Sequence, residues 1–386
     1  MGFCAGRATF LRYHVAGPTP TLFGPEHLAK LAQHALGRQL LAEPDGTEAG
    51  WIASDDILDL GFDLAKNVID DALHFGLRID TQKLPADLLR SYVRSELQTL
   101  AALNPSGRPS AKQKKEAREA AREKLLAEAQ DGRFVRRKAY PLLWDLRTQS
   151  VLIGSASASV LDRAQRLFAD TFGAQLHLRD ATHQAARHAA HAGLAMVRPT
   201  AFVPAGAAPG VAWVGDPASV NFLGNEFLLW LWHALETGSA VIPLADGSHV
   251  TAMLVRTLVL DCPRAVSGNE TIRSEAPTRL PEARRAVAAG KLPRQAGLIL
   301  VRHDEQYELT LQPELLSVHG AKLSGSAERD ERLRFAGRVG QFRQLMETID
   351  LLLDAFLARR LTAGWTQEAE RLRCWLHHDE RLAKAG

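Results

Sequence analysis

The segment from Ser110 to Gly132 predicts a long helix that has little apolar surface to bury. Ser110 and Gln113 have the spacing of a capping box, in which two side chains satisfy backbone N–H groups at the start of a helix. Gly132 stands where a left-handed residue would end it. The residues between them amount to about 30 Å of helix, and the inward positions are mostly alanine. We therefore expect this helix to project from the body of the protein.

A second helix is expected just before this one. Pro85 is typical of a helix start, and the Asn-Pro-Ser-Gly sequence at 104–107 interrupts the pattern before the next helix begins. The apolar stripe of the earlier helix consists of Leu88, Leu89, Tyr92, Val93, Leu97 and Leu100. The two helices together predict a projecting helical hairpin over residues 84–132.

The rest of the chain mixes strands with helices and predicts an α+β fold. Residues 71–82 alternate apolar and polar side chains, which indicates a half-buried strand. Residues 141–154 and 294–312 each have the pattern of a β-hairpin, and the second should turn near His303 to Gln306. Further patterns predict a strand at 8–15, a helix at 25–36 ended by Gly37, a helix at 157–173 and a long amphipathic helix through 339–356.

We expect an elongated chain with several lobes, in which sheets and β-hairpins are packed by helices. The predicted regions are residues 1–83 with 133–175 as a central α/β region, residues 84–132 as the helical hairpin, and residues 176–386 as an α+β base region with the long C-terminal helix. Hydrophobic residues make up 46% of the chain, which is ordinary for a globular protein with an adequate core.

The net charge of +3 conceals an uneven distribution of charged residues. Nine acidic residues stand against one lysine between Glu43 and Asp71, whereas twelve basic residues stand against six acidic ones between Arg108 and Arg147. A second basic window, from Arg264 to Arg294, has seven basic and three acidic residues. Such segregation indicates a directed electrostatic field and a polyanionic partner. Basic helices that are merely solvated remain the alternative.

The sequence lacks the motifs of the common enzyme classes. We find no phosphate-binding glycine loop, no dinucleotide-binding fingerprint and no nucleophile elbow. His177, His183, His188 and His191 match no zinc-ligand spacing, so we interpret them as part of a polar surface. We accordingly expect a protein that is not an enzyme and that needs no metal or cofactor.

Three cysteines, Cys4, Cys262 and Cys374, lie far apart in the sequence and indicate no disulfide framework, which suits a reducing compartment. The first residues do not have the pattern of a signal peptide. The most apolar segment, Phe227–Leu235, is about half the length needed to span a bilayer, and it is more typical of core or partner packing. We expect a cytoplasmic protein that makes no membrane contact.

A short basic cluster follows the predicted hairpin. Phe134 stands between Arg133 and the run Arg136, Arg137 and Lys138. Basic side chains neutralise phosphates and release counterions, so that binding depends on salt and not on base sequence. The phenylalanine could stack on a base, close a contact between subunits, or lie in a core. The sequence pattern leaves these three alternatives open.

Several segments, taken together, resemble the RdgC family of recombination-associated proteins. They are Gly50–Trp51, the strand 76–85 that enters a helix, the basic helix, residues 133–172, residues 282–323 and residues 334–356. The segment from about Gln175 to Met253 is longer than the resemblance leads us to expect, and the N-terminus, with Gly2 and Cys4, also departs from the family pattern. The chain therefore resembles a divergent branch.

The resemblance implies a non-enzymatic, cytoplasmic and nucleoid-associated DNA-binding protein. It implies a ring-shaped homodimer that encircles double-stranded DNA, also binds single strands without sequence preference, and restrains RecA-driven strand exchange. Phe134 matches a phenylalanine at the contact between the two subunits. Lys291 matches a lysine implicated in DNA binding, whereas Leu292 stands where some members have a polar residue.

The basic windows and the resemblance together define the candidate DNA contacts. They are Lys112, Lys115, Arg118, Arg122, Arg133, Arg136, Arg137, Lys138, Lys291 and Arg294. If about six phosphates are neutralised, the log–log slope of affinity against salt should be about −5. Two other functions stay open: a metal-dependent nuclease using Asp304, Glu305 and Glu308, and a protein-only scaffold in which residues 227–235 dock a partner helix.

Overall fold

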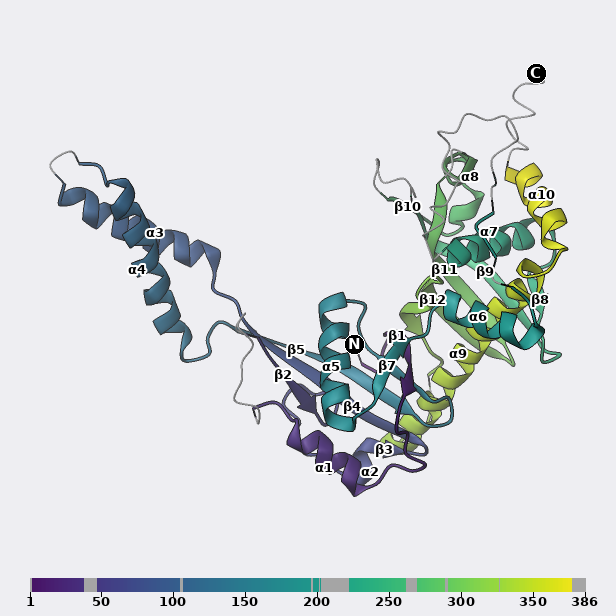
Figure 1. The fold of residues 1–386 in the computed structure, drawn as a ribbon, viewed down its shortest axis with the longest axis horizontal. Coiled ribbons are helices and arrows are strands. Elements are labelled where there is room, and N and C mark those ends of the chain that lie inside the picture. The colour runs from purple at the N-terminus through teal and green to yellow at the C-terminus, as the bar shows by residue number, and fades with distance from the viewer. Residues whose placement is uncertain are drawn as a thin grey trace, which may run out of the picture. The chain divides into compact units, whose positions relative to one another are not determined.

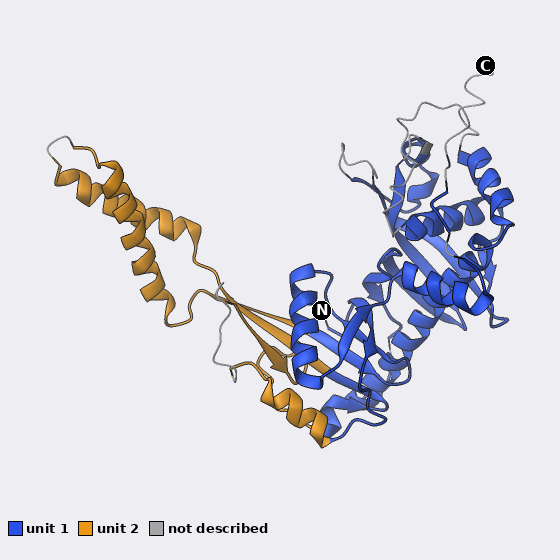
Figure 2. Cartoon of the chain, in the orientation of Figure 1, with its two compact units in different colours: residues 1–24, 64–74, 141–386 blue, residues 25–63, 75–140 orange. Residues whose placement is uncertain are grey.

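The computed structural model describes two compact units of the chain (Figure 2). The described residues are 2–37, 47–104, 107–195, 197–200, 202, 222–261, 269–288, 291–325 and 327–376. Unit 1 consists of Met1–Gly24, Leu64–His74 and Pro141–Gly386, and unit 2 consists of Pro25–Asp63 and Phe75–Tyr140. Both units combine helices with antiparallel strands, so the predicted α+β class is confirmed. The finer division into central, hairpin and base regions stays a prediction.

The sheet of unit 1 is antiparallel in every strand pair that the structure describes there (Figure 1). Its strands, in spatial order, are β10 (Glu270–Ser274), β9 (His249–Asp261), β11 (Leu292–Arg302), β12 (Glu305–Gln312), β13 (Ser317–Lys322), β1 (Ala8–Ala16), β6 (Ser150–Ile153) and β5 (Val135–Asp145). Short strands β3 (Val68–Ile69), β7 (Gln175–Leu178) and β8 (Val241–Pro243) pair with β4 (Ala72–Gln82), β1 and β9.

Both predicted β-hairpins are confirmed. Strands β5 and β6 pair from Leu142 opposite Ile153 to Asp145 opposite Ser150. Strands β11 and β12 turn through His303 and Asp304, whose φ angles of 49° and 64° are left-handed. Two consecutive left-handed residues are typical of the tight turns that match the twist of a two-stranded hairpin.

The helices of unit 1 pack around this sheet. They are α2 (Leu64–Asn67), α5 (Ala158–Phe172), α6 (Ala181–Ala192), α7 (Phe222–Thr237), η1 (Pro277–Arg279), α8 (Pro281–Ala288), α9 (Glu331–Arg360) and α10 (Trp365–Leu376). The predicted faces of α5 and α9 are confirmed, because Val160, Phe168, Val339 and Phe356 are all buried. Spacings of three and four place such residues on one side of a helix, which turns toward the core.

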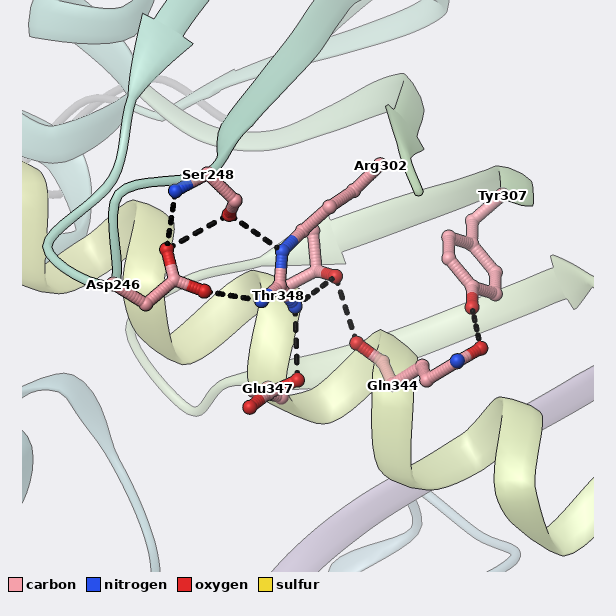
Figure 3. Close-up of polar contacts among 7 residues, drawn as sticks. All are labelled: Asp246, Ser248, Arg302, Tyr307, Gln344, Glu347 and Thr348. Carbon is pink, nitrogen blue, oxygen red and sulfur yellow. Dashed lines mark hydrogen bonds and ion pairs between the residues drawn. The ribbon is translucent and has the colours of Figure 1, made fainter. Parts of the chain in front are cut away.

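Helix α9 is also tied to its surroundings by charged side chains spaced along its length. Arg12 of β1 donates to Asp350 at 2.8 Å, and Arg343 donates to the buried Asp145 at 2.7 Å. Arg302 of β11 lies between Asp246 and Glu347, with nitrogen–oxygen distances of 2.6 and 2.9 Å (Figure 3). Buried ions need such partners because the interior does not solvate them.

Unit 2 contains the predicted helical hairpin and a small group of strands. Its elements are α1 (Pro25–Gln33), β2 (Thr47–Ile52), most of β4, α3 (Ala86–Ala102), α4 (Ala111–Ala129) and the first part of β5. Strands β2 and β4 pair in an antiparallel register, and the ring of Trp51 meets that of Phe75 edge to face at 5.0 Å. Gly50 is required here, because a Cβ atom would lie 2.4 Å from the backbone nitrogen of Leu36.

Two local predictions are wrong. The strand at 71–82, now β4, is not half-buried, because its polar residues His74 and Arg78 are buried as well as its apolar ones. Arg78 tolerates burial because Asp80 accepts two hydrogen bonds from its guanidinium at 2.7 and 2.6 Å. The first helix ends at Gln33 and not at Gly37, because the chain turns there and Ala35 forms a bridge with Trp51.

Candidate nucleic-acid interface

The helices α3 and α4 form an antiparallel pair in unit 2 (Figure 1). Near the turn, Asn104 donates to the side chain of Gln113 at 2.7 Å, and Gln113 also completes the predicted capping box with Ser110. At the opposite end, Tyr92 donates to Glu128 at 2.5 Å, and this bond raises the pKa of the tyrosine. Side-chain hydrogen bonds at both ends therefore fix the register of the two helices.

Four predicted cations lie on α4, and all four are exposed. The side chains of Lys112 and Lys115 are 89% and 80% exposed and lie 3.9 and 3.8 Å from Glu116 and Glu119. Such exposed i,i+4 pairs contribute only about 0.2–0.5 kcal/mol, so a phosphate could displace the glutamates. The other two, Arg118 and Arg122, pair with no acid among the described residues.

The chain turns between α4 and β5 at Gly132, whose φ of 78° is left-handed as predicted. Arg133 follows and makes a close pair with Asp131, with Nη2 and Oδ2 2.6 Å apart. These hydrogen bonds lower the pKa of Asp131 and raise that of Arg133. Phe134 is partly exposed, and its carbonyl accepts from the backbone N–H of Lys83 at 3.0 Å.

The next three cations open strand β5. Arg136 and Lys138 are two residues apart and point to the same side of the strand, while Arg137 points to the other side and lies 3.5 Å from Asp80. All three are exposed, and Arg136 and Lys138 pair with no acid in the described part of the chain.

The two remaining candidates belong to unit 1 and are neutralised there. Lys291 lies 2.5 Å from Glu270. Arg294 lies 3.1 Å from Asp261 and 3.8 Å from Glu314. The structure thus gathers eight of the ten predicted cations and Phe134 in unit 2, and leaves Lys291 and Arg294 in unit 1.

Sequence reasoning missed two arginines of α3. Arg90 and Arg94 line a cavity of about 760 Å³ together with Arg118 and Arg122 of α4. Their spacing of four residues, beside the apolar stripe, was the signal that could have identified them. Arg94 pairs with no acid within the described residues, whereas Arg90 pairs with Asp87.

The segments proposed for the two other functions have structural roles. Trp230 and Trp232 of α7 are about 1% exposed in the core of unit 1, so residues 227–235 do not form a free docking helix. Glu308 is held by Arg7 and Arg256 at 3.0 and 3.1 Å. Both observations weaken the scaffold and nuclease hypotheses. Cys262 and Arg264 lie outside the described residues.

Comparison with known proteins finds no family model and no curated protein that matches this sequence. Among the described residues, no helix has an apolar run long enough to cross a membrane.

Proposed function

We propose that this protein binds double- and single-stranded DNA without sequence preference, through the cations of unit 2. The observation that carries the proposal is the set of exposed guanidinium and ammonium groups on α4 and β5 that lack a carboxylate partner within the described residues. They are Arg118, Arg122, Arg136 and Lys138. A polyanion gives each of them a phosphate partner and releases condensed counterions, which is the main source of affinity in sequence-independent binding.

The candidate contacts can be ranked by how strongly a carboxylate of the protein already holds each cation. After the four unpaired cations, Lys112 and Lys115 are the most available, since each ammonium group makes only a long, exposed contact with its glutamate. Arg133 is least available because Asp131 already accepts its hydrogen bonds. Four to six phosphate contacts correspond to a log–log salt slope between about −3.5 and −5.5.

The assembly that we propose follows the resemblance to the RdgC family. Two copies of the chain form a ring around the duplex, Phe134 contributes to the contact that closes it, and the bound ring restrains RecA-driven strand exchange. Such a protein acts in the cytoplasm, at the nucleoid. The partly exposed Phe134, beside exposed cations, is compatible with a subunit contact next to DNA.

A binding titration tests the proposal. Anisotropy of a labelled linear duplex and of a matched single strand would be measured from low to moderate salt, with the free protein sized in parallel. We expect a dimer that binds both substrates, regardless of base sequence, with the slope given above. Affinity that hardly changes with salt, or no binding at low salt, would contradict the proposal.

A further inference from the structure

The groove between α3 and α4 combines an aliphatic floor with a cationic rim. The floor includes Leu89, Val93 and Leu97 of α3. Arginines from both helices line the same cavity, which has a volume of about 760 Å³. The three floor residues are partly exposed, and an apolar surface that is open to solvent and bordered by charges is typical of an interaction site.

The groove exists because α4 covers only part of the apolar side of α3. The buried residues of α4 include Ala117 and Ala121, and an alanine methyl group covers little of a leucine. As a result, no residue of α3 is buried, although its stripe is apolar. Burying such side chains is favourable by about 25 cal/mol per Å², so a partner would gain by covering them.

The two flanks of the helix pair differ in their contacts. Arg118 and Lys124 stand three residues before and three residues after Ala121, which places them on opposite flanks of the buried stripe of α4. On the Lys124 flank, the ammonium group lies over the Tyr92 ring at 4.6 Å, and Tyr92 also bonds Glu128. The Arg118 flank has no such cover and forms the groove.

The rim favours an anionic ligand. Arg94, Arg118 and Arg122 have no ion pair with any described residue, and the pair between Arg90 and Asp87 is exposed to solvent. Guanidinium groups bind carboxylates through two parallel hydrogen bonds. Three to four arginines around one groove therefore match an acidic ligand in charge.

From these features we propose that the groove binds an acidic protein segment that also carries large apolar side chains. The apolar side chains cover Leu89, Val93 and Leu97, and the carboxylates pair with the arginines of the rim, in the manner of an amphipathic helix in a groove. DNA fits the floor poorly, because bases stack on aromatic rings and the ring of Tyr92 lies on the other flank.

A synthetic probe tests this directly. The probe is a labelled amphipathic helix of about four turns, with leucines on one face and glutamates elsewhere. One control peptide replaces its leucines by serine, and another replaces its glutamates by glutamine. We expect the full-length protein to bind the probe at least about tenfold more tightly than either control. Equal binding of the probe and the serine peptide would overturn the role of the floor.

The groove shares Arg118 and Arg122 with the proposed DNA contacts, so the variants that test it are placed at other residues. Leu97→Ser keeps every charge and is expected to weaken probe binding about tenfold while DNA binding stays unchanged. Arg94→Glu, at a residue outside the proposed DNA contacts, should weaken probe binding at least as much. Lys30→Glu, on the exposed surface of α1, is the matched control and should bind the probe normally.

Two outcomes would assign the groove to another occupant. Loss of DNA affinity in Leu97→Ser, without any binding of the probe, would mean that the groove belongs to the DNA site. A shift from dimer to monomer in Leu97→Ser would mean that a second copy of the chain occupies the groove. The exposed Leu58 and Leu60, which stand among the aspartates of residues 55–63, could supply such a contact. Either result overturns the proposal, whereas the DNA titration fails or succeeds independently of it.

Discussion

The Nζ atom of Lys291 lies 2.5 Å from Oε2 of Glu270. The lysine that the family resemblance assigns to DNA is thus already paired with a carboxylate, which belongs to strand β10, on the far side of β9 from β11. A phosphate can bind Lys291 only by displacing Glu270 or by sharing the lysine with it. If Lys291 contacts DNA, Glu270 competes with the phosphate for it.

Removing this competitor should strengthen DNA binding. In Glu270→Gln the lysine keeps its charge and loses its partner, so we expect DNA affinity to rise about two- to fivefold at low salt. Glu275→Gln, nearby in sequence and exposed, removes the same charge without releasing Lys291 and should change affinity less. The anisotropy titration measures both, and equal effects would mean that Lys291 makes no direct contact.

Arg136 and Lys138 are predicted to contribute phosphate contacts that Arg133 does not. Replacing both by alanine should reduce the magnitude of the salt slope by about 2, because each phosphate contact contributes about one unit. Arg133→Ala should change the slope less, since Asp131 already neutralises this arginine. A larger effect from Arg133→Ala than from the double replacement would reverse our ranking of the contacts.

The helical hairpin and the amphipathic helices could be predicted because their signals are local. The capping box at Ser110 and the periodicity of α5 involve residues within one or a few turns. The pairing of Lys291 with Glu270 could not be predicted, because it depends on the order of the strands in the sheet, where only β9 separates β10 from β11. The burial of Arg78 depends partly on tertiary packing, since the carbonyl of Ile57 accepts a hydrogen bond from its guanidinium, in addition to the local bonds to Asp80.

The uncovered side of α3 could not be predicted from the sequence, for a different reason. Its apolar stripe was visible in the sequence, but a stripe does not say how much of it a partner helix covers. That depends on the alanines at 117 and 121 of α4 and on the side from which they approach. The role that we propose for the arginines at 90 and 94 depends on that uncovered flank.

The charged contacts around α9 predict that the stability of the fold falls over a defined acid range. Ser248 donates to Asp246 at 2.8 Å, and this hydrogen bond, with those from Arg302, lowers the pKa of Asp246 to about 2 (Figure 3). Because the folded pKa lies below the value of 3.8 in an unperturbed chain, the ionised carboxylate stabilises the fold at neutral pH. That contribution is lost as the pH falls from about 4 to about 2.

Ser248→Ala should shift this transition. Without the hydroxyl donor, the pKa of Asp246 rises toward its ordinary value, so the acid-induced fall in Tm should begin at a higher pH than in the unaltered protein. Carboxyl NMR titration and thermal unfolding across the acid range measure the two quantities. An unchanged titration of Asp246 would show that Arg302 and the backbone N–H of Ser248 set its pKa without the hydroxyl.

The ion pair between Arg360 and Glu226 lies in the protein interior, since both side chains are about 95% buried. Arg360→Met would leave the glutamate buried without its cation, and we expect a loss of about 3–5 kcal/mol in the free energy of unfolding. Adding Glu226→Leu should recover most of this loss, because no buried charge remains. Urea unfolding of both variants measures the difference, and an equally unstable double variant would point to lost packing around Arg360.

Phe134→Ala tests the closed ring apart from the DNA contacts. Because Phe134 is only partly buried in unit 2, its truncation should cost little stability. If it closes a subunit contact, the variant should sediment with more monomer and should dissociate from circular duplexes in high-salt washes that the unaltered protein survives. Binding to linear duplex at low salt depends on the cations of α4 and β5 and should fall only modestly. A dimer of unchanged strength, together with weaker binding to single strands, would instead make Phe134 a base-stacking residue.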